Sequence, residues 1–166
     1  MHSTKRSLLP KQHGVYAVEW AIVFPVFFML VYAIVSYGLT FLVRESMQNA
    51  VEDGARAALR YQASQDRNLR RDAAQAVVLE RLGWLPLSLR PEASQVNVTL
   101  CNVLNEANCD WQQKCAAAKS SQCVLRVDLA LPYRDAALAP ALPGLGVLLP
   151  ERLNASASIL VDQGGF

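Results

Sequence analysis

The chain has 166 residues, of which 16 are Lys or Arg and 14 are Asp or Glu, giving a net charge of +2. So small a net charge, without any Lys/Arg-rich run, excludes the strongly basic surface typical of nucleic-acid-binding proteins. Hydrophobic residues make up 52% of the chain. Their concentration near the N-terminus indicates a membrane segment followed by one small soluble domain.

The N-terminal residues 1–14 form a leader with three cations and no acid, the cations being Lys5, Arg6 and Lys11. An apolar run then extends over 15–43 and contains a single charged side chain, Glu19. Since about 20 apolar residues suffice for a transmembrane helix, this run is predicted to cross a bilayer. A carboxylate in such a helix is costly and indicates a functional site with a partner. The succession of basic leader, Gly14, four residues, glutamate and apolar helix is typical of a prepilin-type N-terminus.

A proline and a change of composition mark the next features of this helix. Pro25 removes one backbone hydrogen bond and is expected to kink the helix, either to aid subunit packing or as an ordinary membrane-helix proline. Beyond the bilayer the helix is expected to continue over 44–62, which is rich in Ala, Glu, Gln and Arg. Small and apolar residues recur there at three- and four-residue steps and predict one packed stripe: Met47, Ala50, Val51, Gly54, Ala58 and Tyr61.

The soluble head is predicted to span 63–166 and to begin with a second helix over about 65–82. The charged link 64–67 is a candidate hinge before this helix, and Gly83 with two following prolines ends it. The apolar face of this helix is predicted to consist of Leu69, Ala73, Ala76, Val77 and Leu82.

Three later stretches alternate between apolar and polar residues as strands do. They lie at 95–103, 123–131 and 152–161. Helices followed by strands predict an α+β fold. We expect a long N-terminal transmembrane and amphipathic helix, a second helix, and a small antiparallel sheet with a disulfide-bearing loop.

The four cysteines are clustered in the soluble part of the chain: Cys101, Cys109, Cys115 and Cys123. An even, clustered set in an exported domain predicts two disulfides. A zinc site is not indicated, because close C-x2–4-C pairs are absent. Three connectivities are open. A hairpin of the first two strands favours a nested pattern, with Cys101–Cys123 outside and Cys109–Cys115 inside.

Two signals bear on orientation. The basic leader favours a cytoplasmic N-terminus, whereas three arginines after the membrane run oppose it: Arg44, Arg56 and Arg60. The cysteines decide in favour of an exported head, because disulfides form in an oxidising compartment.

An apolar, proline-punctuated loop over 138–150 joins the last two strands. Exposed apolar patches often mark interfaces, so this loop is a candidate contact surface for a protein partner. The alternative is a loop folded over its own core.

The stretch 11–60, KQHGVYAVEWAIVFPVFFMLVYAIVSYGLTFLVRESMQNAVEDGARAALR, resembles the N-terminus of TadE-like proteins. These are minor pseudopilins of the tight-adherence (Flp, type IVb) pilus system. The shared elements are Gly14, the Val-Glu-Trp unit at 18–20, Pro25 and the DGARAA segment at 53–58. A looser resemblance covers 123–161, where a strand, PYRD, a Pro/Gly loop and NASASI follow one another.

The resemblance implies that a membrane-embedded prepilin peptidase cleaves after Gly14, so that the mature chain begins at Val15 and Glu19 becomes its fifth residue. The new α-amine is largely protonated at neutral pH. It lies one helical turn from Glu19, or approaches the Glu19 of a neighbouring subunit. Such a pair lessens the cost of the carboxylate and favours one packing register. Val15 departs from the family, in which an aromatic residue or methionine is common at this position.

The implied function is that of a minor pseudopilin required for assembly of a type IVb pilus, in a system that serves cell adhesion. The implied location is the bacterial inner membrane, crossed once with the head in the periplasm, or the pilus itself. The implied partners are other pilin and pseudopilin subunits, inner-membrane assembly proteins, the peptidase and the lipid bilayer. Neither a cofactor nor nucleic acid is implied.

Two other interpretations remain open. In the first, residues 1–38 are an ordinary signal peptide. In the second, the chain is a single-pass membrane anchor that keeps its leader and holds a periplasmic binding or scaffold domain. These two and the prepilin interpretation differ in the N-terminal residue expected for the membrane-extracted protein. It is Val15 after cleavage by the prepilin peptidase, Leu39 after removal of a signal peptide, and Met1 with an intact leader. An enzyme is not indicated, because both histidines lie in the leader and no phosphate loop, HExxH motif or nucleophile elbow is present.

Overall fold

The computed structural model describes residues 14–60, 67–103, 105–112, 115, 122–138 and 149–161. The chain forms two compact units, 1–38 and 39–166. One helix, α1 (Gly14–Arg60), contributes to both. The second unit adds α2 (Arg67–Arg81) and the strands β1 (Val96–Asn102), β2 (Asn105–Cys109), β3 (Cys123–Pro132) and β4 (Arg152–Val161). The described residues of this unit also include two short 3-10 turns, η1 (Ala93–Gln95) and η3 (Arg134–Ala136).

The first unit consists, over its described residues, of the apolar part of α1. The helix continues through Pro25 without a break. Its large apolar side chains are exposed, among them Trp20 at 67% and Phe28 at 61%. The helix is long and apolar enough to cross a membrane, and its position near the N-terminus fits a single-pass anchor.

The part of α1 that belongs to the second unit is buried along one stripe. Five predicted members of that stripe are buried: Met47, Ala50, Val51, Gly54 and Ala58. The sixth, Tyr61, lies outside the described residues. The prediction of an amphipathic extension is therefore confirmed from Met47 to Ala58, and this extension belongs to the same compact unit as the sheet.

The predicted apolar face of α2 is wrong by about one position. Leu69 is 46% exposed and Ala76 is exposed, whereas Ala74 and Val78 are fully buried. Of the predicted residues, Leu82 is fully buried as expected. The arginine at the same spacing, Arg70, is only 4% exposed. The sequence prediction did not include Arg70 in the apolar face, because arginine is charged. Its long aliphatic stem nevertheless allows an arginine to lie within a packed interface. The predicted hinge at 64–67 falls mostly outside the described residues.

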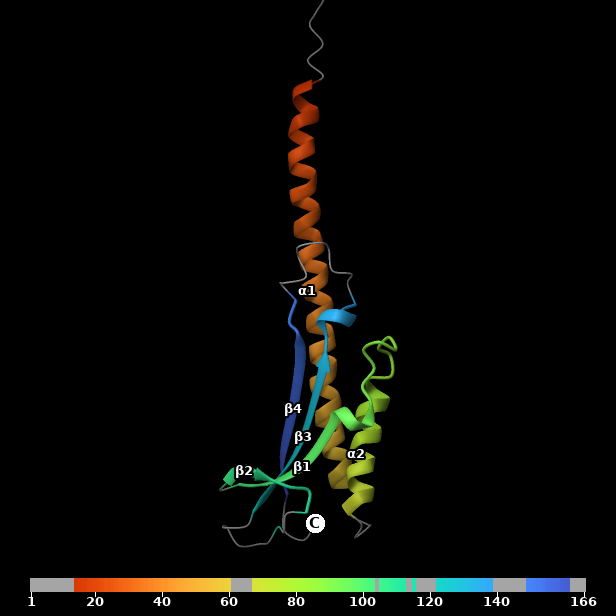
Figure 1. The fold of residues 1–166 in the computed structure, drawn as a ribbon, viewed down its shortest axis with the longest axis vertical. Coiled ribbons are helices and arrows are strands. Elements are labelled where there is room, and N and C mark those ends of the chain that lie inside the picture. Colours follow the sequence, from red (N-terminus) through yellow and green to blue (C-terminus); the bar gives the residue numbers. More distant parts are fainter. Residues whose placement is uncertain are drawn as a thin grey trace, which may run out of the picture. The chain divides into compact units, whose positions relative to one another are not determined.

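The sheet is antiparallel, with strand order β2-β1-β3-β4. The three predicted strands are present, and β2 is a fourth that the sequence did not indicate. Alternate residues of β1, β3 and β4 are buried, so each strand turns one face to the core. Figure 1 shows β1, β3 and β4 beside the second-unit part of α1, with α2 next to that helix.

Candidate functional site

Gly14 and Glu19, the predicted processing and assembly residues, both lie on α1. Gly14 is its first residue, and Glu19 is exposed on the helix surface. Its neighbours Tyr16, Val18 and Trp20 are exposed by 62–68%. This part of α1 thus presents one carboxylate on an otherwise apolar surface.

The DGARAA segment lies where α1 crosses α2. A Cβ at Gly54 would meet Val78 Cγ2 at 2.6 Å and the carbonyl oxygen of Ala74 at 3.0 Å. Only glycine permits this close approach, because any side chain would enter the neighbouring helix. Beside it, Asp53 pairs with Arg81 of α2 at 3.0 Å. Gly54 is therefore a helix-crossing residue in this fold.

The PYRD segment holds the base of the loop that precedes β4. The amide of Tyr133 donates to the carbonyl oxygen of Glu151 at 2.9 Å, and Arg134 pairs with the Glu151 carboxylate at 2.8 Å. Arg134 also donates to the carbonyl oxygen of Leu149 at 3.3 Å. The buried Tyr133 hydroxyl accepts a hydrogen bond from the Thr40 hydroxyl at 3.2 Å. These contacts fix both ends of the loop against α1.

The predicted contact residues of that loop fall mostly on 139–148, outside the described residues. At its two ends, Leu149 is 7% exposed and Leu138 packs against the core. The described ends therefore belong to the core, and the contact role of the intervening residues stays a prediction.

Two disulfides are formed, Cys101–Cys109 and Cys115–Cys123, and no cysteine is free. The prediction of two intramolecular disulfides is confirmed. The nested pairing, Cys101–Cys123 with Cys109–Cys115, is wrong. Each observed bond instead joins cysteines eight positions apart in the sequence.

The register of the sheet explains the error. In the β1–β3 pair, Cys123 lies opposite Asn102, and Cys101 lies opposite Val124. Directly opposed residues share a face and successive residues alternate, so Cys101 and Cys123 point to opposite faces of the sheet. Cys101 is instead the direct partner of Cys109 on β2. Cys109 lies on the short polar strand NEANC. This strand has no apolar–polar alternation, so the sequence analysis did not predict it.

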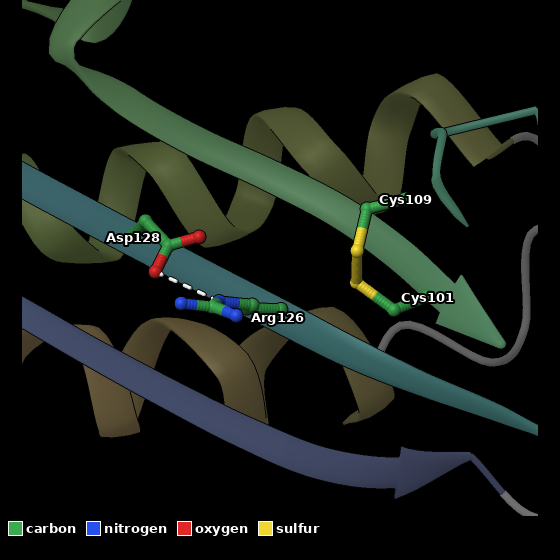
Figure 2. Close-up of a disulfide and its surroundings, with 4 residues drawn as sticks. All are labelled: Cys101, Cys109, Arg126 and Asp128. Atoms are coloured by element: carbon green, nitrogen blue, oxygen red, sulfur yellow. Dashed lines mark hydrogen bonds and ion pairs between the residues drawn. A yellow bond between two sulfur atoms is a disulfide. The ribbon is translucent and has the colours of Figure 1, made fainter. Parts of the chain in front are cut away.

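The sheet face that carries Cys101–Cys109 is polar. Figure 2 shows this disulfide and the Arg126–Asp128 ion pair in front of the strands, with the helices behind them. A shallow cavity of about 280 Å³ lies here, lined by Cys101, Asn102, Val124, Arg126, Ser156, Ala157 and Ser158. The ion pair is 3.0 Å long but largely exposed, so it contributes little stability.

No catalytic constellation is evident on the described part of the head. Among the residues that the structure describes, no three His, Cys, Asp or Glu side chains are placed to hold a metal ion. The larger hollow between α1 and α2 is lined by charged and apolar residues: Asp53, Arg56, Ala57, Arg60, Val77, Glu80 and Arg81.

Comparison with known proteins gives one match. The model of the family described as TadE-like protein matches residues 14–56. This range begins at Gly14 and includes Glu19, Pro25 and Gly54, so the resemblance noted in the sequence is confirmed over the N-terminal helix. No curated protein and no solved structure matches the chain.

Proposed function

We propose that this chain, which is TadE-like over its N-terminal helix, is a minor pseudopilin required for assembly of a tight-adherence (type IVb) pilus. The family match indicates a protein associated with the Tad pilus and carrying an anchor-like N-terminal helix, and the family consists of structural proteins rather than enzymes. The finer role rests on one observation: Glu19 is the only charged residue in the 15–43 part of a helix that begins at Gly14.

The proposed mechanism uses both residues. A prepilin peptidase cleaves after Gly14 and leaves Val15 with a free α-amine. The protonated amine of one subunit pairs with Glu19 of another, because an unpaired carboxylate in the bilayer is costly. The pair fixes the axial register of neighbouring helices. The head stands in the periplasm, where its two disulfides are stable, and it contacts pilin subunits or inner-membrane assembly proteins.

Cleavage is tested by substituting Gly14→Leu in the full chain in a piliated host. The wild-type protein is expected to begin at Val15, and the variant to retain all 14 leader residues, as measured by intact mass after membrane extraction. His13→Leu is the control, since it alters the leader without touching the cleavage glycine. An intact leader in the wild-type protein would instead support the alternative function, a single-pass periplasmic scaffold.

Assembly is tested separately with Glu19→Gln, which keeps the shape of the side chain and removes its charge. We expect normal insertion and cleavage, because the variant lowers the cost of membrane insertion, but loss of surface pili. Glu45→Gln, an exposed acid of the same helix beyond the apolar run, should leave piliation intact. Normal pili with Glu19→Gln would refute the assembly role.

A further inference from the structure

The apolar run and the packed head overlap along α1. The run ends at Val43 in the sequence, yet Thr40 and Val43 are already buried within the second unit, at 8% and 0% exposure. On the opposite side of the same helix segment, Phe41 is 65% exposed and Leu42 is 50% exposed. At 1.5 Å per residue, the overlap amounts to about 6 Å of helix. The head therefore begins before the apolar surface ends, without a polar spacer.

The part of the head that lies beside these exposed apolar residues of α1 is the Arg152 end of β4. The hydrogen bond from Thr40 to Tyr133 holds the end of β3 against the helix, and Pro132 of β3 pairs with Arg152 of β4. Farther along, the Gln48 amide donates to the carbonyl oxygen of Ser156 at 3.0 Å. Between these contacts lies a groove of about 390 Å³, lined by Phe41, Arg44, Glu45, Gln48, Asn154 and Ser156. Figure 1 shows β4 beside α1 in this unit.

Two arginines flank the exposed apolar side chains. Arg44 lines the groove, and Arg152 lies on the same face of β4 as the groove residue Asn154. Both are exposed and form no ion pair with another described residue. The third arginine at this end, Arg134, is already paired with Glu151. Arg44 and Arg152 are thus the cations that remain for an external anion.

We propose that this end of the head, defined by Phe41, Leu42, Arg44 and Arg152, rests directly on the phospholipid surface. Phe41 and Leu42 lie at the boundary between acyl chains and headgroups, where exposed apolar residues beside arginines are favourable. Arg44 and Arg152 bind headgroup phosphates, which guanidinium groups contact through two parallel hydrogen bonds. The inference rests on the proposed anchoring of α1 in a bilayer and adds a second contact with the membrane.

A photo-crosslinker distinguishes the two ends of β4. Benzoyl-phenylalanine replaces either Arg152 or Leu160 in the full chain, reconstituted in nanodiscs of phosphatidylethanolamine and phosphatidylglycerol. Both residues are exposed on the same face of one strand, and their separation of eight residues is about 26 Å. We expect lipid adducts at position 152 to exceed those at position 160 several-fold, as measured by intact mass. Equal yields, or no adduct at 152 in a chain retained in the disc, would overturn the inference.

The arginines are tested by native mass spectrometry of the detergent-solubilised chain with added phosphatidylglycerol. Arg44→Gln combined with Arg152→Gln should at least halve the fraction of protein that carries lipid. Arg60→Gln, an exposed arginine of the same helix about 24 Å farther along, should not. Equal lipid retention in all three proteins would contradict the phosphate contact. Failure of the wild-type chain to remain in nanodiscs would instead refute the anchor itself, and with it this inference.

Discussion

At the scale of single residues, Glu19 and Gly54 stand out for different physical reasons. Glu19 is costly in an apolar helix, so its presence indicates a function outside the chain. Gly54 is different, because glycine is needed at this position for packing within the fold. The helices α1 and α2 approach so closely at this position that even a methyl group would overlap Val78. The matched N-terminal range thus contains both Glu19, the proposed assembly residue, and Gly54, a packing residue.

Gly54→Ala should destabilise the head. Overpacking costs about 1–3 kcal/mol, and the better helix propensity of alanine returns about 1 kcal/mol, which leaves a net loss on the order of 1 kcal/mol. Val78 has little freedom to move away, because a β-branched side chain in a helix prefers one rotamer. The loss should lower the melting temperature of the detergent-solubilised chain by a few degrees.

Two further variants isolate the cause. Gly38→Ala makes the same change in the same helix, where the new Cβ would meet no described atom within 4 Å apart from its chain neighbours and the helix's own backbone, so the melting temperature of the head should not fall. In a Val78→Ala background the cost of Gly54→Ala should shrink, because one of the two close contacts is removed. An undiminished cost in that background would place the strain at the Ala74 carbonyl instead.

At the scale of elements, the pairing of neighbouring strands determines which cysteines form disulfides. β2 is a short polar strand, and its antiparallel pairing with β1 brings Cys109 opposite Cys101. Cys123 lies at the start of β3 and faces the core, where it is fully buried. Its bond to Cys115 therefore ties a loop residue to the core side of the sheet, whereas Cys101–Cys109 lies on the opposite face.

Tryptic mapping without reduction should verify this framework. Trypsin cuts after Lys114 and Lys119, which separates Cys115 from Cys123 but leaves Cys101 and Cys109 in one peptide. The observed pairing predicts one internally linked peptide and one linked pair, 115–119 with 120–126. A nested or crossed pairing would instead join all three peptides into one species. Each bond closes a loop of similar length and should contribute roughly 2–3 kcal/mol.

At the scale of the whole molecule, α1 has two parts with different surroundings. Its first part exposes apolar side chains as a membrane anchor does, and its later part supplies a buried stripe to the core of the second unit. Anchor and head are thus joined through a continuous helix rather than through a linker.

The proposed topology gives a direct test on cells. Trypsin added to spheroplasts should degrade the head, because Lys114 and Lys119 lie on its cysteine-bearing segment outside the cytoplasm. In inside-out vesicles the head should be protected until detergent is added. Alkylation of the membrane-bound chain without reduction should label no cysteine, since all four are paired. Protection in spheroplasts, or four labelled cysteines, would place the head in the cytoplasm and refute export.

The sequence by itself determined the features that depend on local periodicity and composition. The apolar run, the helix continuing beyond it and three of the four strands followed from periods of 3.6 and 2 residues, and the structure confirms them. Gly14 and Glu19 were also selected as candidate processing and assembly residues from the sequence alone, because a glycine ends the basic leader and one acid interrupts the apolar run. Their roles stay predictions.

The tertiary structure alone decided which faces meet. The buried face of α2 depends on the close crossing at Gly54, which moves the contact to Ala74 and Val78. The disulfide pairing depends on strand register, because a shift of one residue exchanges the two faces of a sheet. The contact between Thr40 and Tyr133 joins residues 93 positions apart. Such long-range contacts depend on how the elements pack, so no local sequence pattern specifies them.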